Sequence, residues 1–101
     1  MLIEKGIPHS KLIVVKAMAE VGKVAATASA FQGAQDLGIN DLDGMCAVVM
    51  NLAPSNFFKS MTTFADHRIL QDVYRTHADG KDVYLKLPVI DDVLIVSFKE
   101  Q

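Results

Sequence analysis

The sequence lacks the features that identify several large protein classes. Among 101 residues there is no tryptophan. The single cysteine, Cys46, excludes an internal disulfide framework, and no cluster of cysteine and histidine has the spacing of a zinc site. No apolar run approaches the roughly 18 residues that a membrane helix needs, and the first residues do not read as a signal peptide. We therefore expect a cytoplasmic protein without a membrane partner. Cys46 lies in an apolar run and is expected to be a small buried hydrophobic residue.

An excess of charge of either sign is also missing. Ten lysines and arginines stand against twelve aspartates and glutamates, so the formal net charge is only -2. Bulk electrostatics therefore does not indicate a nucleic-acid-binding protein. Any such role must depend on a local surface.

Hydrophobic residues make up 50% of the sequence, enough for one core in a chain of this length. We expect one domain over residues 1–101. In the N-terminal half, residues that favour helix ends bracket three apolar segments. The expected N-caps are Ser10, Thr27 or Ser29, and Asp41 or Asp43, and the expected stops are Gly22, Gly38 and Pro54. The third segment is nearly all apolar and could be a buried strand, but the preceding aspartate favours a helix.

The C-terminal half alternates between apolar and polar residues with a period of two. Residues 57–65, 68–76, 82–90 and 92–99 are rich in β-branched and aromatic residues and read as four strands of an antiparallel meander. Asp79-Gly80 is the clearest turn between them. Pro88 cannot donate a ladder hydrogen bond, so the third strand should be irregular or lie at an edge there. Helices followed by strands predict an α+β fold, with an antiparallel sheet packed against the N-terminal helices.

Alternation also divides the strand residues between two faces. One face should carry Val83, Leu85, Leu87 and Val89 of the third strand, and Leu94, Val96 and Phe98 of the fourth. If the register matches, the other face gathers polar side chains without a carboxylate: Lys59, Gln71, Arg75, Tyr84, Lys86 and Lys99. Such a surface suits an anion. The alternative is that these lysines only protect an exposed face and block edge pairing, beside an ordinary half-buried tyrosine.

Several strings resemble one protein family. In order and spacing, "PHSKL", "DGMCAVVMNL", "FFKSMTTFADHRILQDVYR", "DVYLKL" and "DVLIVSFKE" are similar to the MqsR family of bacterial type II toxins. The resemblance implies a fold like that of the RelE and YoeB toxins. It implies metal-independent, cofactor-free cleavage of messenger RNA at short GC-containing sequences of the GCU type, which inhibits translation and growth. It also implies an antitoxin with a zinc-binding N-terminal domain and a helix-turn-helix C-terminal domain, through which alone the toxin would reach operator DNA.

The resemblance also assigns residues. By position, the family's catalytic residues fall on Lys59, Gln71, Tyr84 and Lys99. RNA carries its own nucleophile, the 2'-hydroxyl, so the lysines would stabilise charge on the phosphate, Tyr84 would transfer a proton or stack on a base, and Gln71 would orient the phosphate or a base edge. Related sequences can carry histidine where this chain has Asp91, which adds a negative charge.

Three further residues are expected to bind substrate. Arg75 and Lys86 would hold the RNA backbone. His9 precedes the first helix, whose dipole could bind phosphate, although a solvated residue before a helix is an equal alternative. The pairs Asp41 with Asp43 and Asp91 with Asp92 are expected to serve local hydrogen bonding, not metal binding.

Two other function classes remain open. A non-catalytic RNA-binding regulatory module could use the same cationic surface, and an interaction protein could pair its strands with a partner. Cleavage of RNA separates the enzyme from both.

Overall fold

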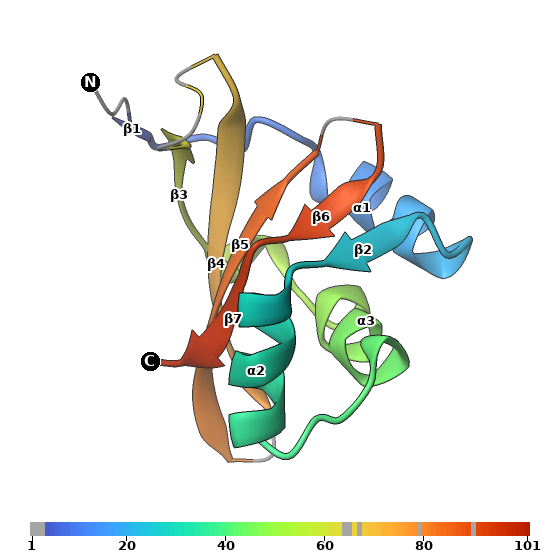
Figure 1. Ribbon diagram of the computed structural model, residues 1–101. Helices are drawn as coiled ribbons and strands as arrows, with labels where there is room; N and C mark the ends of the chain where they lie inside the picture. Colours follow the sequence, from blue (N-terminus) through green and yellow to red (C-terminus); the bar gives the residue numbers. More distant parts are fainter. Residues whose placement is uncertain (1–3, 64–65, 67, 79, 90) are drawn as a thin grey trace.

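The computed structural model describes residues 4–63, 66, 68–78, 80–89 and 91–101 (Figure 1). The ends of two expected strands, at Phe64, Ala65 and Ile90, and the turn residues His67 and Asp79 lie outside the described residues. Within the described part, three α-helices precede most of a five-stranded antiparallel sheet, so the expected α+β class is confirmed. No helix in these ranges is long and apolar enough to cross a membrane.

The N-terminal half forms the helices α1 (Leu12–Glu20), α2 (Ala28–Asp36) and α3 (Leu42–Met50). Two of the expected N-caps are confirmed: Thr27 Oγ1 accepts the Ala30 N–H at 3.2 Å, and Asp41 Oδ1 accepts the Gly44 N–H at 2.8 Å. The apolar third segment is therefore a helix. A short 3₁₀ helix, η1 (Pro54–Asn56), links it to the sheet.

The expected cap of α1 is wrong. Lys11 occupies the N-cap position without a side-chain hydrogen bond. Ser10 instead donates its backbone N–H to Asp72 Oδ2 at 2.9 Å. A carboxylate 62 residues away in the sequence thus fixes the entry to the helix, a contact that a local capping pattern cannot indicate.

The main sheet has the strand order β1-β3-β4-β5-β7 and is antiparallel throughout. Its strands are β1 (Glu4–Lys5), β3 (Phe57–Thr62), β4 (Leu70–Ala78), β5 (Lys81–Pro88) and β7 (Ser97–Glu100). The expected meander is confirmed, with the N-terminal β1 added at its edge. Pro88 ends β5 beyond the pairing with β7, which stops at Lys86, so its missing N–H leaves no gap in that ladder.

The last expected strand is interrupted. Its first part, β6 (Val93–Ile95), leaves the meander and pairs in parallel with β2 (Val24–Ala26). Val96, at the break, donates its N–H to the Lys86 carbonyl at 3.1 Å. The break shifts the alternation by one residue, so Val93 and Ile95 are buried where we expected Leu94 and Val96.

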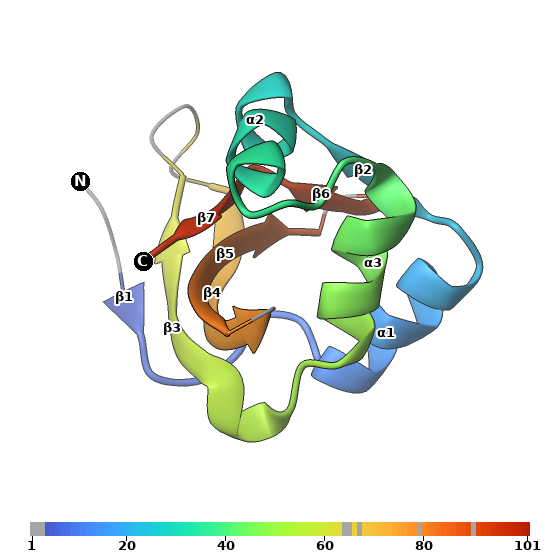
Figure 2. The ribbon, with the colours of Figure 1, turned by 90° about the horizontal axis from the view of Figure 1, so that it is seen from below.

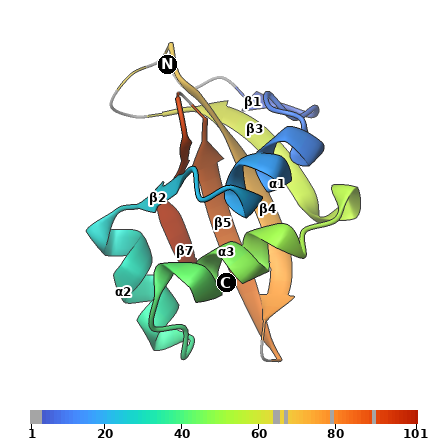
Figure 3. The same ribbon diagram turned by 90° about the vertical axis from the view of Figure 1, so that its right-hand side faces the viewer.

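The helices cover one face of the main sheet (Figures 1 and 3). On that face, Val83, Leu85 and Leu87 of β5 and Phe98 of β7 are buried against Val15 of α1, Ala34 of α2 and Met45 and Val49 of α3. Helix α2 lies along the outer edge of β7 (Figure 2). A Cβ atom at Gly33 would lie 1.8 Å from the Phe98 carbonyl oxygen, so this close approach needs glycine.

Candidate functional site

The sheet register brings the expected polar residues onto the face opposite the helices. Residues directly opposite each other on antiparallel strands share a face. Arg75, Tyr84 and Lys99 are such partners across β4, β5 and β7 and form one row. In the next row, Val73 of β4 pairs with Lys59 of β3 on one side and with Lys86 of β5 on the other. We call Lys59, Gln71, Arg75, Tyr84, Lys86 and Lys99 the cationic face.

Tyr84 lies between two lysines of this face. The ring centroid of Tyr84 is 5.7 Å from Lys86 Nζ and 5.6 Å from Lys99 Nζ, within the range of a cation–π contact. Both ammonium groups are therefore held near the phenol. A phosphate bound beside Tyr84 would meet the ammonium groups of Lys86 and Lys99 and the hydroxyl group of Tyr84.

Gln71 lies at one end of the cationic face, opposite Met61 on β3 and Pro88 on β5. Its side chain is 5% exposed, whereas Arg75 and Lys99 are exposed. A buried amide keeps a fixed orientation more easily than an exposed one because its rotamers are restricted by neighbours. This position suits a residue that orients a bound group.

Phe58 is a residue of this surface that the sequence did not reveal to us. Arg75 Cζ lies 3.4 Å from the centroid of the Phe58 ring, and Lys59 Nζ lies 5.2 Å from it. The register of β3 shifts between Phe57 and Lys59. The sequence did contain a signal for this residue, two adjacent aromatics before a lysine. Regular alternation buries only one of two neighbours, so the other aromatic must lie on the opposite face.

Comparison with known proteins identifies the family. A family model described as "Motility quorum-sensing regulator, toxin of MqsA" matches residues 7–100. The chain belongs to the MqsR toxin family. It is 52% identical over 99 residues to the "mRNA interferase toxin MqsR" of Escherichia coli (strain K12), an alignment that covers 98% of this chain and 100% of that protein. The resemblance drawn from the sequence strings is confirmed.

In this MqsR family member, His9 is not brought onto the cationic face by its backbone. The His9 N–H donates to Asp72 Oδ1 at 2.8 Å. Asp72 follows Gln71 on β4 and therefore points to the opposite, helix-covered side. His9 itself is exposed, and substrate binding by it remains a prediction without support from this geometry. Asp91 is exposed between β5 and β6, outside the rows of the cationic face.

Two other titratable groups lie away from these rows. Tyr74 is on the helix side of β4, and its buried hydroxyl has no hydrogen-bond partner among the described residues. Burial, with a smaller contribution from the Asp72 charge, raises the pKa of Tyr74 to about 12. Burial and the Asp43 charge also raise the pKa of the Cys46 thiol. Cys46 is half-buried against the core, so an activated thiolate is disfavoured there.

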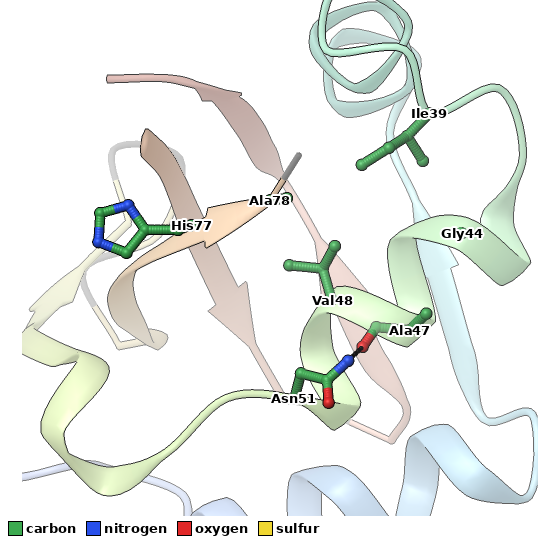
Figure 4. Close-up of a pocket in the computed structure, with 7 residues that line it drawn as sticks. All are labelled: Ile39, Gly44, Ala47, Val48, Asn51, His77 and Ala78. Carbon is green, nitrogen blue, oxygen red and sulfur yellow. Dashed lines mark hydrogen bonds between the residues drawn. The ribbon is translucent and has the colours of Figure 1, made fainter. Parts of the chain in front are cut away.

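A cavity of about 350 Å³ lies between α3 and the end of β4 (Figure 4). Its lining is mostly apolar, and none of the six cationic-face residues contributes to it. In Figure 4 the His77 imidazole points away from the helix, and this side chain pairs with Asp82 instead. The cavity is therefore separate from the residues that the MqsR resemblance assigns to catalysis.

Proposed function

We propose that this MqsR-family toxin cleaves messenger RNA on the cationic face, at short GC-containing sites of the GCU type, and thereby inhibits translation and growth. The chain is a toxin endoribonuclease by its family and by its 52% identity to a protein named as an mRNA interferase. The site residues, the cleaved sequence and independence from metal are our proposals. The messenger substrate also favours action in the cytoplasm, where translation takes place.

The observation that carries the site assignment is the pairing of Arg75, Tyr84 and Lys99 across three strands, beside Lys59 and Lys86. None of the six residues of the face is acidic, although the whole chain has a formal net charge of -2. Four of these six residues are cationic, and Asp82, which lies on the same side of β5, pairs with His77. Preorganised cations of this kind stabilise the extra negative charge of a phosphate in its transition state.

The proposed reaction uses the nucleophile of RNA itself. The 2'-hydroxyl loses its proton to water and attacks the adjacent phosphorus, the bond from phosphorus to the 5'-oxygen breaks, and a 2',3'-cyclic phosphate forms. Lys59 and Lys99 stabilise the charge on the phosphate. Tyr84, held between two lysines, donates a proton to the departing 5'-oxygen, and the buried Gln71 orients the phosphate or a base edge. This chemistry requires no metal ion, because the lysines supply the positive charge.

We further propose how the toxin is controlled. The family description names MqsA beside the toxin. We infer that the partner is an antitoxin of two domains, with a zinc-binding N-terminal part and a helix-turn-helix C-terminal part. The toxin would then reach operator DNA only through that partner. We also propose that residues 1–101 act as one domain with a fold like that of the RelE and YoeB toxins. In support, this chain has the antiparallel sheet with helices on one side that the resemblance implies.

A digest of a defined RNA tests the proposed function. The purified protein is incubated in EDTA with an unstructured RNA that contains one GCU, beside a control RNA in which those three bases are permuted. We expect one cut in the first RNA, with a cyclic phosphate or 3'-phosphate at the new end, and none in the control. Binding of RNA without fragments would instead support a non-catalytic regulatory module, and cuts in both RNAs would contradict the proposed sequence preference.

A further inference from the structure

A β-bulge turns one aromatic side chain onto the cationic face. Phe57 pairs with Tyr74 and Lys59 pairs with Val73, so Phe58 is an extra residue in β3 without a partner of its own in β4. Phe57 packs edge-on against Tyr74, with ring centroids 5.7 Å apart, on the helix side of the sheet. Bulges re-aim side chains and are over-represented next to active sites. Here the bulge puts Phe58 on the same side as its neighbour Lys59, whereas regular alternation would put the two on opposite sides.

Phe58 and Arg75 form a stack on this surface. Arg75 Cζ lies 3.4 Å from the Phe58 centroid, which is the separation of two stacked planar groups, so the guanidinium lies on the ring. Phe58 is still 40% exposed, and Arg75 is exposed. In the part of the chain that the structure describes, no carboxylate pairs with the Arg75 guanidinium. The pair thus presents a flat surface to solvent.

The stack borders the proposed catalytic residues. Arg75 lies directly opposite Tyr84, and Lys59 follows Phe58 in the chain with its Nζ 5.2 Å from the Phe58 ring. We propose that the Phe58–Arg75 stack is a platform on which one unpaired base of the RNA lies, next to the scissile phosphate. Unstacked RNA bases are recognised by stacking on aromatic rings and on arginine guanidinium planes. This role rests on the proposed function and adds to it a residue that positions the substrate.

The platform makes a different claim from a phosphate contact by Arg75. A phosphate contact needs the charge of Arg75, whereas a platform needs its plane and the ring beneath it. Arg75→Lys keeps the charge and removes the plane, and Phe58→Leu keeps an apolar side chain and removes the ring. Phe58→Tyr keeps the ring and is the conservative control. Because Phe58 and Arg75 lie at the surface, these variants should remain folded, which thermal unfolding verifies.

The test measures binding of an RNA that carries a 2'-deoxy sugar at the cut site and 2-aminopurine at one neighbouring base. The chain has no tryptophan, so the fluorescence of the probe is read without protein interference. We expect binding by the native protein to quench the probe at one position. Phe58→Leu and Arg75→Lys should each lose this quenching and bind roughly tenfold more weakly or worse, with an unchanged salt dependence, and Phe58→Tyr should match the native protein.

Two results would overturn the platform. Native quenching and affinity in Phe58→Leu would show that no base lies on the ring. If Arg75→Lys bound the RNA normally and only Arg75→Ala bound it weakly, Arg75 would contribute its charge and not its planar guanidinium. The native protein's cleavage of unmodified RNA is measured in parallel, so that failure of the platform, with cleavage intact, is distinguished from failure of the proposed function.

Discussion

Tyr84 on β5 lies directly opposite Lys99 on β7, with Lys99 Nζ 5.6 Å from the centre of the Tyr84 ring. Lys99 follows Phe98, whose carbonyl oxygen faces Gly33 of α2 at a distance that leaves no room for a side chain. The helix at the edge of the sheet therefore sets the position of β7. A proposed catalytic lysine depends in this way on a glycine that does not belong to the site.

This dependence predicts the effect of Gly33→Ala. The added Cβ would lie 1.8 Å from the Phe98 carbonyl oxygen, so α2 and β7 must separate. We expect a loss of about 1 to 3 kcal/mol in the free energy of unfolding, measured with urea, and slower RNA cleavage because Lys99 moves with β7. The matched control is Gly6→Ala, where no atom lies within 4 Å of the added carbon. Equal stability of the two variants would contradict the packing.

Lys86→Ala tests how the cationic face holds RNA. If Lys86 contacts a phosphate, its loss should weaken binding on all sequences alike and reduce the log-log salt slope by roughly 0.7. Gln71→Ala carries no charge change and should alter cleavage rate or site choice at nearly the same slope. Binding of a non-cleavable RNA is measured at several salt concentrations. An unchanged slope in Lys86→Ala would mean that RNA lies elsewhere.

Tyr74 predicts a loss of stability in alkaline solution. Its folded-state pKa is raised to about 12. Below pH 10 the phenol is therefore neutral in the folded and the unfolded state, and it does not change the free energy of unfolding. Between pH 10 and about 12 only the unfolded state loses the proton, and the free energy of unfolding should fall by at most about 2 to 3 kcal/mol. Tyr74→Phe should remove this decrease.

Tyr74→Phe also tests the unpartnered hydroxyl. At pH 7 the variant should be as stable as the native protein or slightly more so, because no hydrogen bond is lost. Urea unfolding of both proteins at pH 7 and in the alkaline range measures the two effects together. Destabilisation of the variant by more than about 1 kcal/mol at pH 7 would show that the hydroxyl has a partner.

Cys46→Ser should leave RNA cleavage intact. The thiol lies on α3, away from the cationic face, and burial raises its pKa, so it takes no part in phosphate chemistry. A small loss of stability is expected, since a hydroxyl replaces a half-buried apolar group. Initial cleavage rates of the native and variant proteins, compared at equal folded concentration, measure this. Loss of activity in a folded variant would assign the thiol a role.

The cationic face could be predicted from the sequence because alternation along a strand does not depend on its neighbours. Once Arg75 and Tyr84 are paired, the remaining rows follow from a period of two. The features that we missed each change this period by one residue. The bulge at Phe58 and the break at Val96 are set by contacts with distant segments, such as the hydrogen bond from Val96 to Lys86.

Very short elements and long-range caps also escaped the sequence pattern. β1 and β2 have two and three residues, too few for alternation to be recognised. The placement of His9 was inferred from the helix that follows it, whereas the carboxylate of Asp72 determines where its backbone lies. That contact joins residues that are 63 apart in the sequence, and only the folded chain brings them together.

The most direct test of the proposed mechanism compares RNA cleavage in EDTA by the native protein, Lys59→Met and Lys81→Met. Lys59 belongs to the cationic face, whereas Lys81 is an exposed lysine at the start of β5 that does not. We predict discrete fragments with cyclic phosphate ends from the native protein and from Lys81→Met, and cleavage at least about a hundredfold slower by Lys59→Met. Equal rates in all three proteins, or no cleavage by the native protein until a metal ion is added, would contradict it.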